Sequence, residues 1–80
     1  MSEVPPPLPV DAEWDAGELG CGELVLTLRG RLEVLAPGQV LKLTALDPGA
    51  PADIPAWCHL TGHLLVQQRH PVYLIRRKER

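Results

Sequence analysis

An apolar stripe bounded by glycine and proline constrains the fold of this chain more than any other feature. Between Gly-Cys-Gly at 20–22 and Pro37-Gly38, apolar residues recur at the spacing of one helix face: Leu24, Val25, Leu28, Leu32 and Leu35. This spacing predicts a helix that runs from Glu23 to the Pro-Gly stop and buries one side. Gly30 costs a helix about 1 kcal/mol relative to alanine, so we expect close packing against a strand there.

Runs with β-strand character flank this helix. Residues 12–15 predict a first strand that directs Trp14 into the core. Residues 40–46 predict a second strand with one buried face, because Lys42 and Thr44 alternate with apolar residues.

The second half of the chain predicts one more helix and a hairpin. Asp53 caps or begins the helix, with Pro55 near its start, and Gly62 ends it. Its apolar side consists of Ile54, Trp57, Cys58 and Leu60. Residues 64–68 and 72–76 then predict two strands joined by a turn at His70-Pro71.

The order strand, helix, strand, helix, strand, strand predicts an α+β fold. A two-layer α/β sandwich, with a four-stranded mixed sheet and two helices on one face, buries these patterns. The 80 residues suffice for one domain, at 12–77. Residues 1–11 are proline-rich and predict a disordered arm, and residues 78–80 form a basic C-terminal tail.

Composition and charge exclude several functional classes. No segment is long and apolar enough to span a membrane, and the first ten residues lack a secretory-signal pattern, so we expect a cytoplasmic protein with reduced cysteines. The net charge is −2, and the basic residues gather near the C-terminus, where we expect a solvated tail. Tyr73 is the only aromatic residue nearby, so the sequence disfavours direct nucleic-acid binding.

Cys21 lies at the predicted start of the first helix. Free backbone N–H groups and the helix dipole stabilise a thiolate at such a position, whereas the charge of Glu23 opposes it. From these residues alone, Cys21 is equally well interpreted as a reactive thiol or as an inert small residue.

Four stretches follow one another across residues 14–77: WDAGELGC, LAPGQVLKLTALDP, DIPAWCHLTGHLL and YLIRR. Together they resemble the TusA/SirA family of small sulfur-carrier proteins. WDAGELGC resembles the family's lead-in, with Asp15 and Cys21 at the family's separation. LAPGQVLKLTALDP is similar to its Pro-Gly turn, second strand and Asp-Pro corner. DIPAWCHLTGHLL is similar to its Asp-Ile-Pro-x-Phe-Cys…Gly-His block, and YLIRR to its closing strand. The resemblance implies the same two-layer sandwich, with a TusA-like domain at 12–77.

The resemblance also implies a mechanism. In that family, the cysteine of a Cys-Pro-x-Pro motif accepts sulfane sulfur as a persulfide and passes it on, in tRNA thiolation or sulfur metabolism. By position, Cys21 is that catalytic nucleophile. The implied partners are a sulfur donor protein, such as a cysteine desulfurase, and a sulfur acceptor protein. The activity would be that of a sulfurtransferase relay, and no cofactor is implied.

The motif departs from the family pattern, because Gly22-Glu23-Leu24 replaces Pro-x-Pro. Glycine makes the turn after Cys21 looser than proline does, so Gly22 and Glu23 shape the site in a new way. The alternative hypothesis is a non-catalytic interaction or regulatory module that kept the fold and lost sulfur transfer.

Other polar and sulfur-containing residues are interpreted mainly as structural. Cys58 reads as a buried small apolar residue, with a secondary role as a resolving cysteine as the alternative. His59 and His63 could share zinc with Cys58, but Gly62 breaks the helix between them, so we expect no metal site and a hydrogen-bonded structural His63. The chain positions of Asp15 and Asp47 are typical of turn formation.

Overall fold

A computed structural model describes residues 10–79 of the chain and confirms the predicted α+β fold. The predicted arm therefore lies mostly outside the described residues, as does Arg80. The elements follow the predicted order: β1 (Ala12–Gly17), α1 (Cys21–Glu33), β2 (Val40–Ala45), α2 (Ala50–Thr61), β3 (Leu64–Arg69) and β4 (Val72–Arg76).

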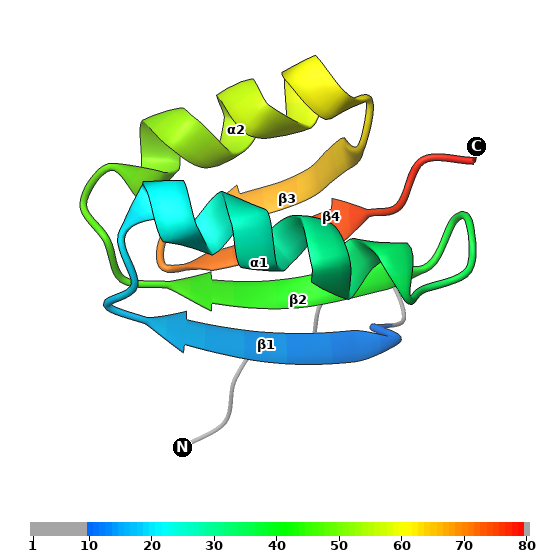
Figure 1. Cartoon of the computed structure of the whole chain (residues 1–80), viewed down its shortest axis with the longest axis horizontal. Helices are drawn as coiled ribbons and strands as arrows, with labels where there is room; N and C mark the ends of the chain where they lie inside the picture. Colours follow the sequence, from blue (N-terminus) through cyan, green and yellow to red (C-terminus); the bar gives the residue numbers. More distant parts are fainter. Residues whose placement is uncertain (1–9, 80) are drawn as a thin grey trace.

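The four strands form one mixed sheet in the order β1-β2-β4-β3, and both helices cover the same face (Figure 1). The β1–β2 pair is parallel, whereas the β2–β4 and β3–β4 pairs are antiparallel. Because β1 and β2 are parallel, their carboxyl ends lie at one edge of the sheet. Since α1 follows β1 and α2 follows β2, the N-termini of both helices meet at that edge.

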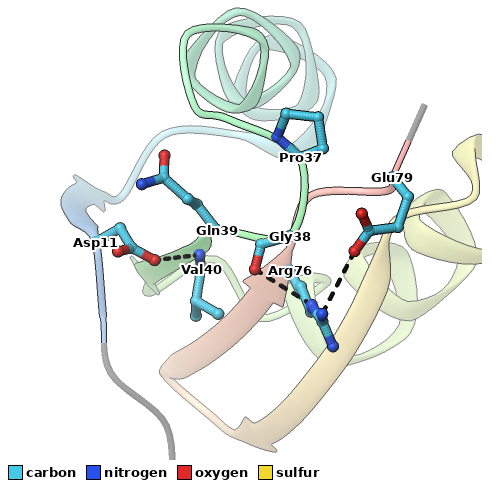
Figure 2. A pocket seen from close by; sticks show the side chains of 7 residues that line it. All are labelled: Asp11, Pro37, Gly38, Gln39, Val40, Arg76 and Glu79. Carbon is cyan, nitrogen blue, oxygen red and sulfur yellow. Dashed lines mark hydrogen bonds and ion pairs between the residues drawn. The ribbon is translucent and has the colours of Figure 1, made fainter.

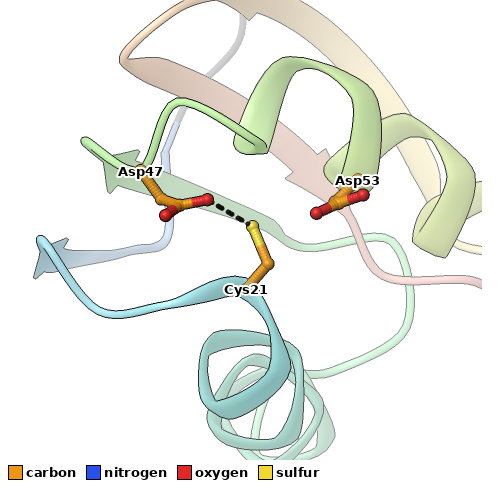
Figure 3. Close-up of side chains that lie close together, drawn as sticks. All are labelled: Cys21, Asp47 and Asp53. Carbon is orange, nitrogen blue, oxygen red and sulfur yellow. Dashed lines mark hydrogen bonds between the residues drawn. The ribbon is translucent and has the colours of Figure 1, made fainter.

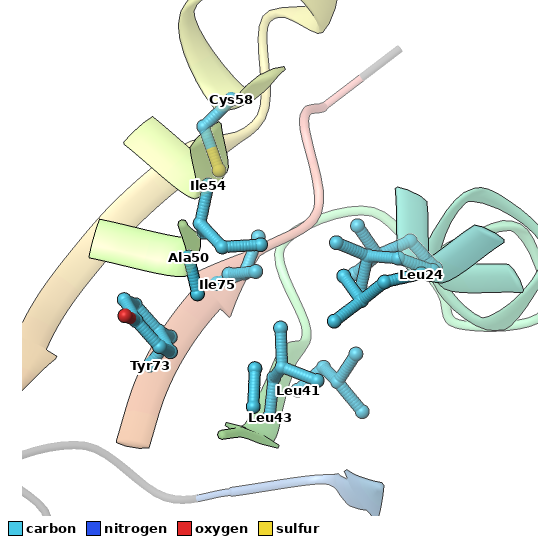
Figure 4. Packing of buried hydrophobic residues seen from close by; sticks show 11 residues of the cluster. Leu24, Leu41, Leu43, Ala50, Ile54, Cys58, Tyr73 and Ile75 are labelled. Atoms are coloured by element: carbon cyan, nitrogen blue, oxygen red, sulfur yellow. The ribbon is translucent and has the colours of Figure 1, made fainter. Parts of the chain in front are cut away.

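The core lies between the helices and the sheet (Figure 4). The apolar stripe of α1 contributes three fully buried leucines: Leu24, Leu28 and Leu32. The helix α2 and the sheet supply the rest of the cluster: Ala50, Ile54, Cys58, Leu41, Leu43, Ala45, Tyr73 and Ile75. Trp14 is half-buried at the margin of this core, and the guanidinium carbon of Arg31 lies 4.8 Å from its ring centroid. Leucine, isoleucine and alanine, with one cysteine and one tyrosine, thus fill the layer without any phenylalanine.

The helix α1 begins at Cys21, two residues before the predicted start. Gly20 is the N-cap, in an extended conformation, and its carbonyl accepts the first helical hydrogen bond from the Leu24 N–H at 2.8 Å. The helix ends at Glu33, so Leu35 packs against the core from the following loop instead of from the helix.

The helix α2 begins at Ala50, earlier than predicted, so Pro55 lies inside it. Proline at 55 has no N–H to donate to the carbonyl of Pro51 one turn earlier. That carbonyl instead accepts a hydrogen bond from the Gln68 side chain of β3 at 2.9 Å. A proline inside α2 is tolerated because a neighbouring strand replaces the lost donor.

Two packing predictions were wrong. Leu60 is 83% exposed, and a side chain built at Gly30 would meet no atom within 4 Å. Both residues lie on the solvent-exposed side of their helices, so neither packs against the sheet. The predicted stop at Gly62 is confirmed, since Gly62 adopts the left-handed conformation and its N–H donates to the Cys58 carbonyl at 2.9 Å.

The chain after β4 is anchored to the end of α2. The Lys78 ammonium donates to the Thr61 carbonyl at 2.9 Å, and the Lys78 N–H donates to Nδ1 of His63 at 3.1 Å. Lys78 is exposed, as expected for a solvated tail, but it is held in place.

None of the helices in the described part of the chain is long and apolar enough to cross a membrane.

Candidate functional site

Cys21 is the first residue of α1, at the edge where the N-termini of both helices meet. Its thiol is free and partly buried. The flanking residues Gly20 and Gly22 are exposed, and neither would bring a Cβ within 4 Å of another residue. The cysteine therefore stands at an open corner of the molecule, with room for another protein to approach.

Two aspartates surround the sulfur atom of Cys21 (Figure 3). The thiol donates a hydrogen bond to Oδ2 of Asp47, in the loop after β2, at 3.0 Å. The same oxygen accepts the Gly49 N–H at 3.0 Å, which fixes its position. Asp53, in the first turn of α2, approaches from the other side, so that one ligand-type atom from each residue lies within 4.8 Å of the others.

This environment raises the pKa of Cys21 to about 12, first through burial and then through Asp47 and Asp53. Of the two influences weighed from the sequence, the helix start favours a thiolate, but the surroundings of the sulfur favour the neutral thiol. The helix dipole contributes about half a positive charge, whereas the charges of Asp47 and Asp53 beside the sulfur act in the opposite direction. The resting site holds a neutral thiol.

A shallow, largely apolar hollow of about 340 Å³ opens beside the thiol. It lies between α1 and α2 and is lined by Cys21, Gly22, Val25, Asp53, Ala56, Trp57 and Leu60. The exposed side chain of Leu60 therefore forms part of the wall of this hollow. Gly22 lines the hollow, whereas Glu23 is exposed and lies outside the lining; the site-shaping role of both stays a prediction.

Comparison with known proteins decides the family. The model of the family described as Sulfurtransferase TusA matches residues 12–77, most of the chain. The chain belongs to the TusA family.

Curated TusA-family relatives match nearly the full chain. The chain is 45% identical over 74 residues to a protein named Sulfur carrier protein TusA from Pseudomonas paraeruginosa, covering 88% of this chain and 94% of the relative. Proteins of the same name from Pseudomonas aeruginosa strain LESB58 and Pseudomonas putida strain GB-1 are 44% and 42% identical. These matches cover 86% and 85% of this chain, and 92% and 90% of the two relatives.

The second cysteine of this TusA-family chain has a different environment. Cys58 is only 2% exposed and belongs to the core, which confirms its predicted burial. Burial raises its pKa to about 11. Its sulfur is free, so the structure contains no bond between the two cysteines.

The zinc hypothesis for Cys58, His59 and His63 gains no support, since these three do not converge in the described part of the chain. His59 is exposed, whereas His63 stacks on Trp57 with ring centroids 5.4 Å apart. Nδ1 of His63 accepts the Lys78 N–H, which confirms a hydrogen-bonded structural histidine. Burial first, and then Lys78 and Arg77, lower the pKa of His63.

Asp47 and Asp53 lie at Cys21, which was not predicted from the sequence. Asp47 was predicted to form a turn, and the bond to the Gly49 N–H confirms that role. One signal could have revealed the second role, because the carboxyl ends of adjacent parallel strands share an edge. A cysteine shortly after β1 and an aspartate shortly after β2 must then be neighbours.

The cluster of Cys21, Asp47 and Asp53 is compact enough for a cation to bridge. The hydrogen bond from the thiol to Asp47 already accounts for the short sulfur–oxygen approach. The geometry therefore requires no metal.

A second hollow, of about 500 Å³, lies at the opposite end of the sheet (Figure 2). Its polar groups are paired: Arg76 donates to the Gly38 carbonyl at 3.2 Å and contacts Glu79 at 3.4 Å, and the Val40 N–H donates to Asp11 at 2.8 Å. No thiol or histidine lines it. These contacts close the end of the sheet, and we assign no chemistry to them.

Proposed function

We propose that this protein is a sulfur carrier that accepts sulfane sulfur as a persulfide on Cys21 and passes it to an acceptor protein. Membership of the TusA family and the name shared by its curated relatives support this function. A carrier needs a donor and an acceptor protein. We propose a cysteine desulfurase as the donor, and tRNA thiolation or sulfur metabolism in the cytoplasm as the setting.

The observation that carries the assignment to Cys21 is the contrast between the two thiols. Cys21 is partly exposed on the wall of a hollow that a partner can enter, whereas Cys58 is buried in the core. Transfer of sulfur between proteins requires the two sulfur atoms to touch, so only Cys21 can react without local unfolding.

The two positions at which the family motif has proline, Gly22 and Leu24, are both helical in this chain. Proline at the start of a helix preorganises the backbone there. In this chain α1 nevertheless begins at Cys21, with Gly22 and Leu24 in helical positions and the Gly20 carbonyl accepting the first bond. The name shared by the curated relatives supports the carrier over a module that kept only the fold.

Intact-mass spectrometry tests the proposal. The protein is incubated with a cysteine desulfurase and cysteine, and with other persulfide donors, and the mass gain of one sulfur is measured. We expect the gain in the wild type and in Cys58→Ser but not in Cys21→Ser. Equal loss in both variants would contradict the assignment of Cys21, and no gain with any donor would favour the interaction module.

A further inference from the structure

The hydrogen bond between Cys21 and Asp47 gives the thiol proton a defined neighbour. The Sγ–Oδ2 distance is 3.0 Å, and the Gly49 N–H holds the same oxygen in place. Asp47 is partly buried between the end of β2 and the start of α2, so its carboxylate is positioned by two elements at once. Figure 3 shows this side chain pointing at the sulfur.

We propose that Asp47 is a catalytic residue that accepts the Cys21 proton when sulfur is loaded and returns it when sulfur leaves. This inference rests on the proposed carrier function. It gives a chemical task to a residue whose sequence position indicated only a turn.

The need for a proton acceptor follows from the groups that face the sulfur. Asp47 from the loop after β2 and Asp53 from α2 both favour the neutral thiol. Tyr73 of β4 is fully buried; burial and then Cys21 raise its pKa, so it stays neutral too. A neutral thiol is a poor nucleophile, and a thiolate of high pKa is a poor leaving group. A base that takes the proton during attack, and gives it back during departure, removes both obstacles.

In the loading step, the Cys21 sulfur attacks the outer sulfur of a donor persulfide, R–S–SH. A new S–S bond forms at Cys21, the S–S bond of the donor breaks, and R–S⁻ leaves with the bonding electron pair. The thiol proton moves to the Asp47 carboxylate, 3.0 Å away. The products are Cys21–S–SH and R–S⁻, so one persulfide is exchanged for another and no external oxidant or reductant is needed.

Unloading runs the same steps in reverse. A thiolate of the acceptor attacks the outer sulfur of Cys21–S–SH, and the Cys21 sulfur leaves. Protonated Asp47 returns the proton to that sulfur as the S–S bond breaks. One carboxylate therefore serves both directions of transfer, as microscopic reversibility requires.

Asp53 provides the matched control. Asp53 also raises the pKa of Cys21, through a side-chain hydrogen bond and its charge, but it is exposed and comes after Asp47 among the causes, and the contact at 3.0 Å is to Asp47. Removing the Asp53 charge lowers the thiol pKa and leaves the proton acceptor in place. Asp47→Asn lowers the thiol pKa as well but takes the acceptor away. The two variants should therefore change the thiol pKa in the same direction and the transfer rate in opposite directions.

The experiment uses glutathione persulfide as the donor and measures loading of Cys21 by intact mass over time. General bases contribute about 10²- to 10⁴-fold, so we expect loading to fall at least about tenfold in Asp47→Asn, even after the gain in thiolate. We expect faster loading in Asp53→Asn. Thiolate absorbance at 240 nm, measured against Cys21→Ser, should appear at lower pH in both variants than in the wild type.

Conservative variants separate a proton acceptor from a structural role. Asp47→Glu keeps a carboxylate and should recover part of the lost loading rate. Asp47→Gln has the same shape as Asp47→Glu but no carboxylate, so it should not recover the rate. This pair also serves if Asp47→Asn does not fold, and urea unfolding checks the folded fraction of each variant. Two results would overturn the role of Asp47 alone while the wild type still loads sulfur. One is an unchanged loading rate in Asp47→Asn, and the other is an equal loss of rate in Asp47→Glu and Asp47→Gln. No loading of the wild type overturns the carrier function and this inference together.

Discussion

The two cysteines lie on the two helices that cover the same sheet, yet their thiols have different chemistry. Both pKa values are raised, that of Cys21 to about 12 and that of Cys58 to about 11. Burial alone raises the pKa of Cys58, whereas Asp47 and Asp53 add to burial at Cys21. The two pKa values are similar, but Cys58 is buried out of reach of partner proteins, whereas Cys21 lies beside a carboxylate that we propose as its proton acceptor.

The largest expected effect concerns the pH profile of Cys21. A pKa of about 12 instead of 9.0 leaves about 1000-fold less thiolate at neutral pH than an ordinary cysteine has. In Cys58→Ser, alkylation by iodoacetamide should rise about tenfold per pH unit from pH 7 to 10, since the thiolate fraction does so below the pKa. Rates are followed by intact mass. A plateau of the alkylation rate below pH 9 would show that Cys21 is an activated thiolate. The contrast drawn between the two thiols would then be wrong.

The next effect is on stability and uses matched serine substitutions. Cys58→Ser places a hydroxyl in the core, so we expect the free energy of unfolding to fall by about 1–3 kcal/mol. Cys21→Ser lies at an open helix start and should change it by less than about 0.5 kcal/mol. Urea unfolding measures both, and Cys58→Ala separates lost volume from added polarity. Equal destabilisation at the two positions would contradict the assigned difference in burial.

The smallest effect tests the loose turn after Cys21. Gly22 and Gly30 both lie in α1 with open space around them, so alanine at either position should stabilise the protein by about 0.5–1 kcal/mol. Only Gly22 lines the hollow beside the thiol. A change in the rate of sulfur loading in Gly22→Ala, but not in Gly30→Ala, would support the predicted site-shaping role of Gly22. Equal rates in both would remove that role.

Much of the fold could be predicted from local pattern. The stripe of Leu24, Leu28 and Leu32 is buried as its 3.6-residue period requires, and Gly62 ends α2 as predicted. Helix starts were less predictable, because capping by Gly20 and Gly49 involves no side-chain hydrogen bond. The exposure of Leu60 follows from the same period, because Leu60 comes two residues after the buried Cys58 and so lies on the opposite side of α2.

The candidate site was predicted only in part. The resemblance to the TusA/SirA family led to Cys21 and to the carrier hypothesis; the family match supports the carrier, and the role of Cys21 stays a prediction. The electrostatic state of the thiol was missed, because it depends on Asp47 and Asp53, which are 26 and 32 positions away in the chain. Near the helix start in the sequence, only Glu23 and the helix dipole act on the thiol.

The sequence by itself determined the order of elements, the buried faces and the cysteine that ends up at the open corner. These follow from periodicity, from glycine and proline punctuation, and from the family motif, all of which act over a few residues. Only the tertiary structure decided that this thiol is neutral and hydrogen-bonded to Asp47. The reason is physical: charges interact through space, and the parallel pairing of β1 and β2 brings a distant carboxylate to within 3.0 Å of the sulfur.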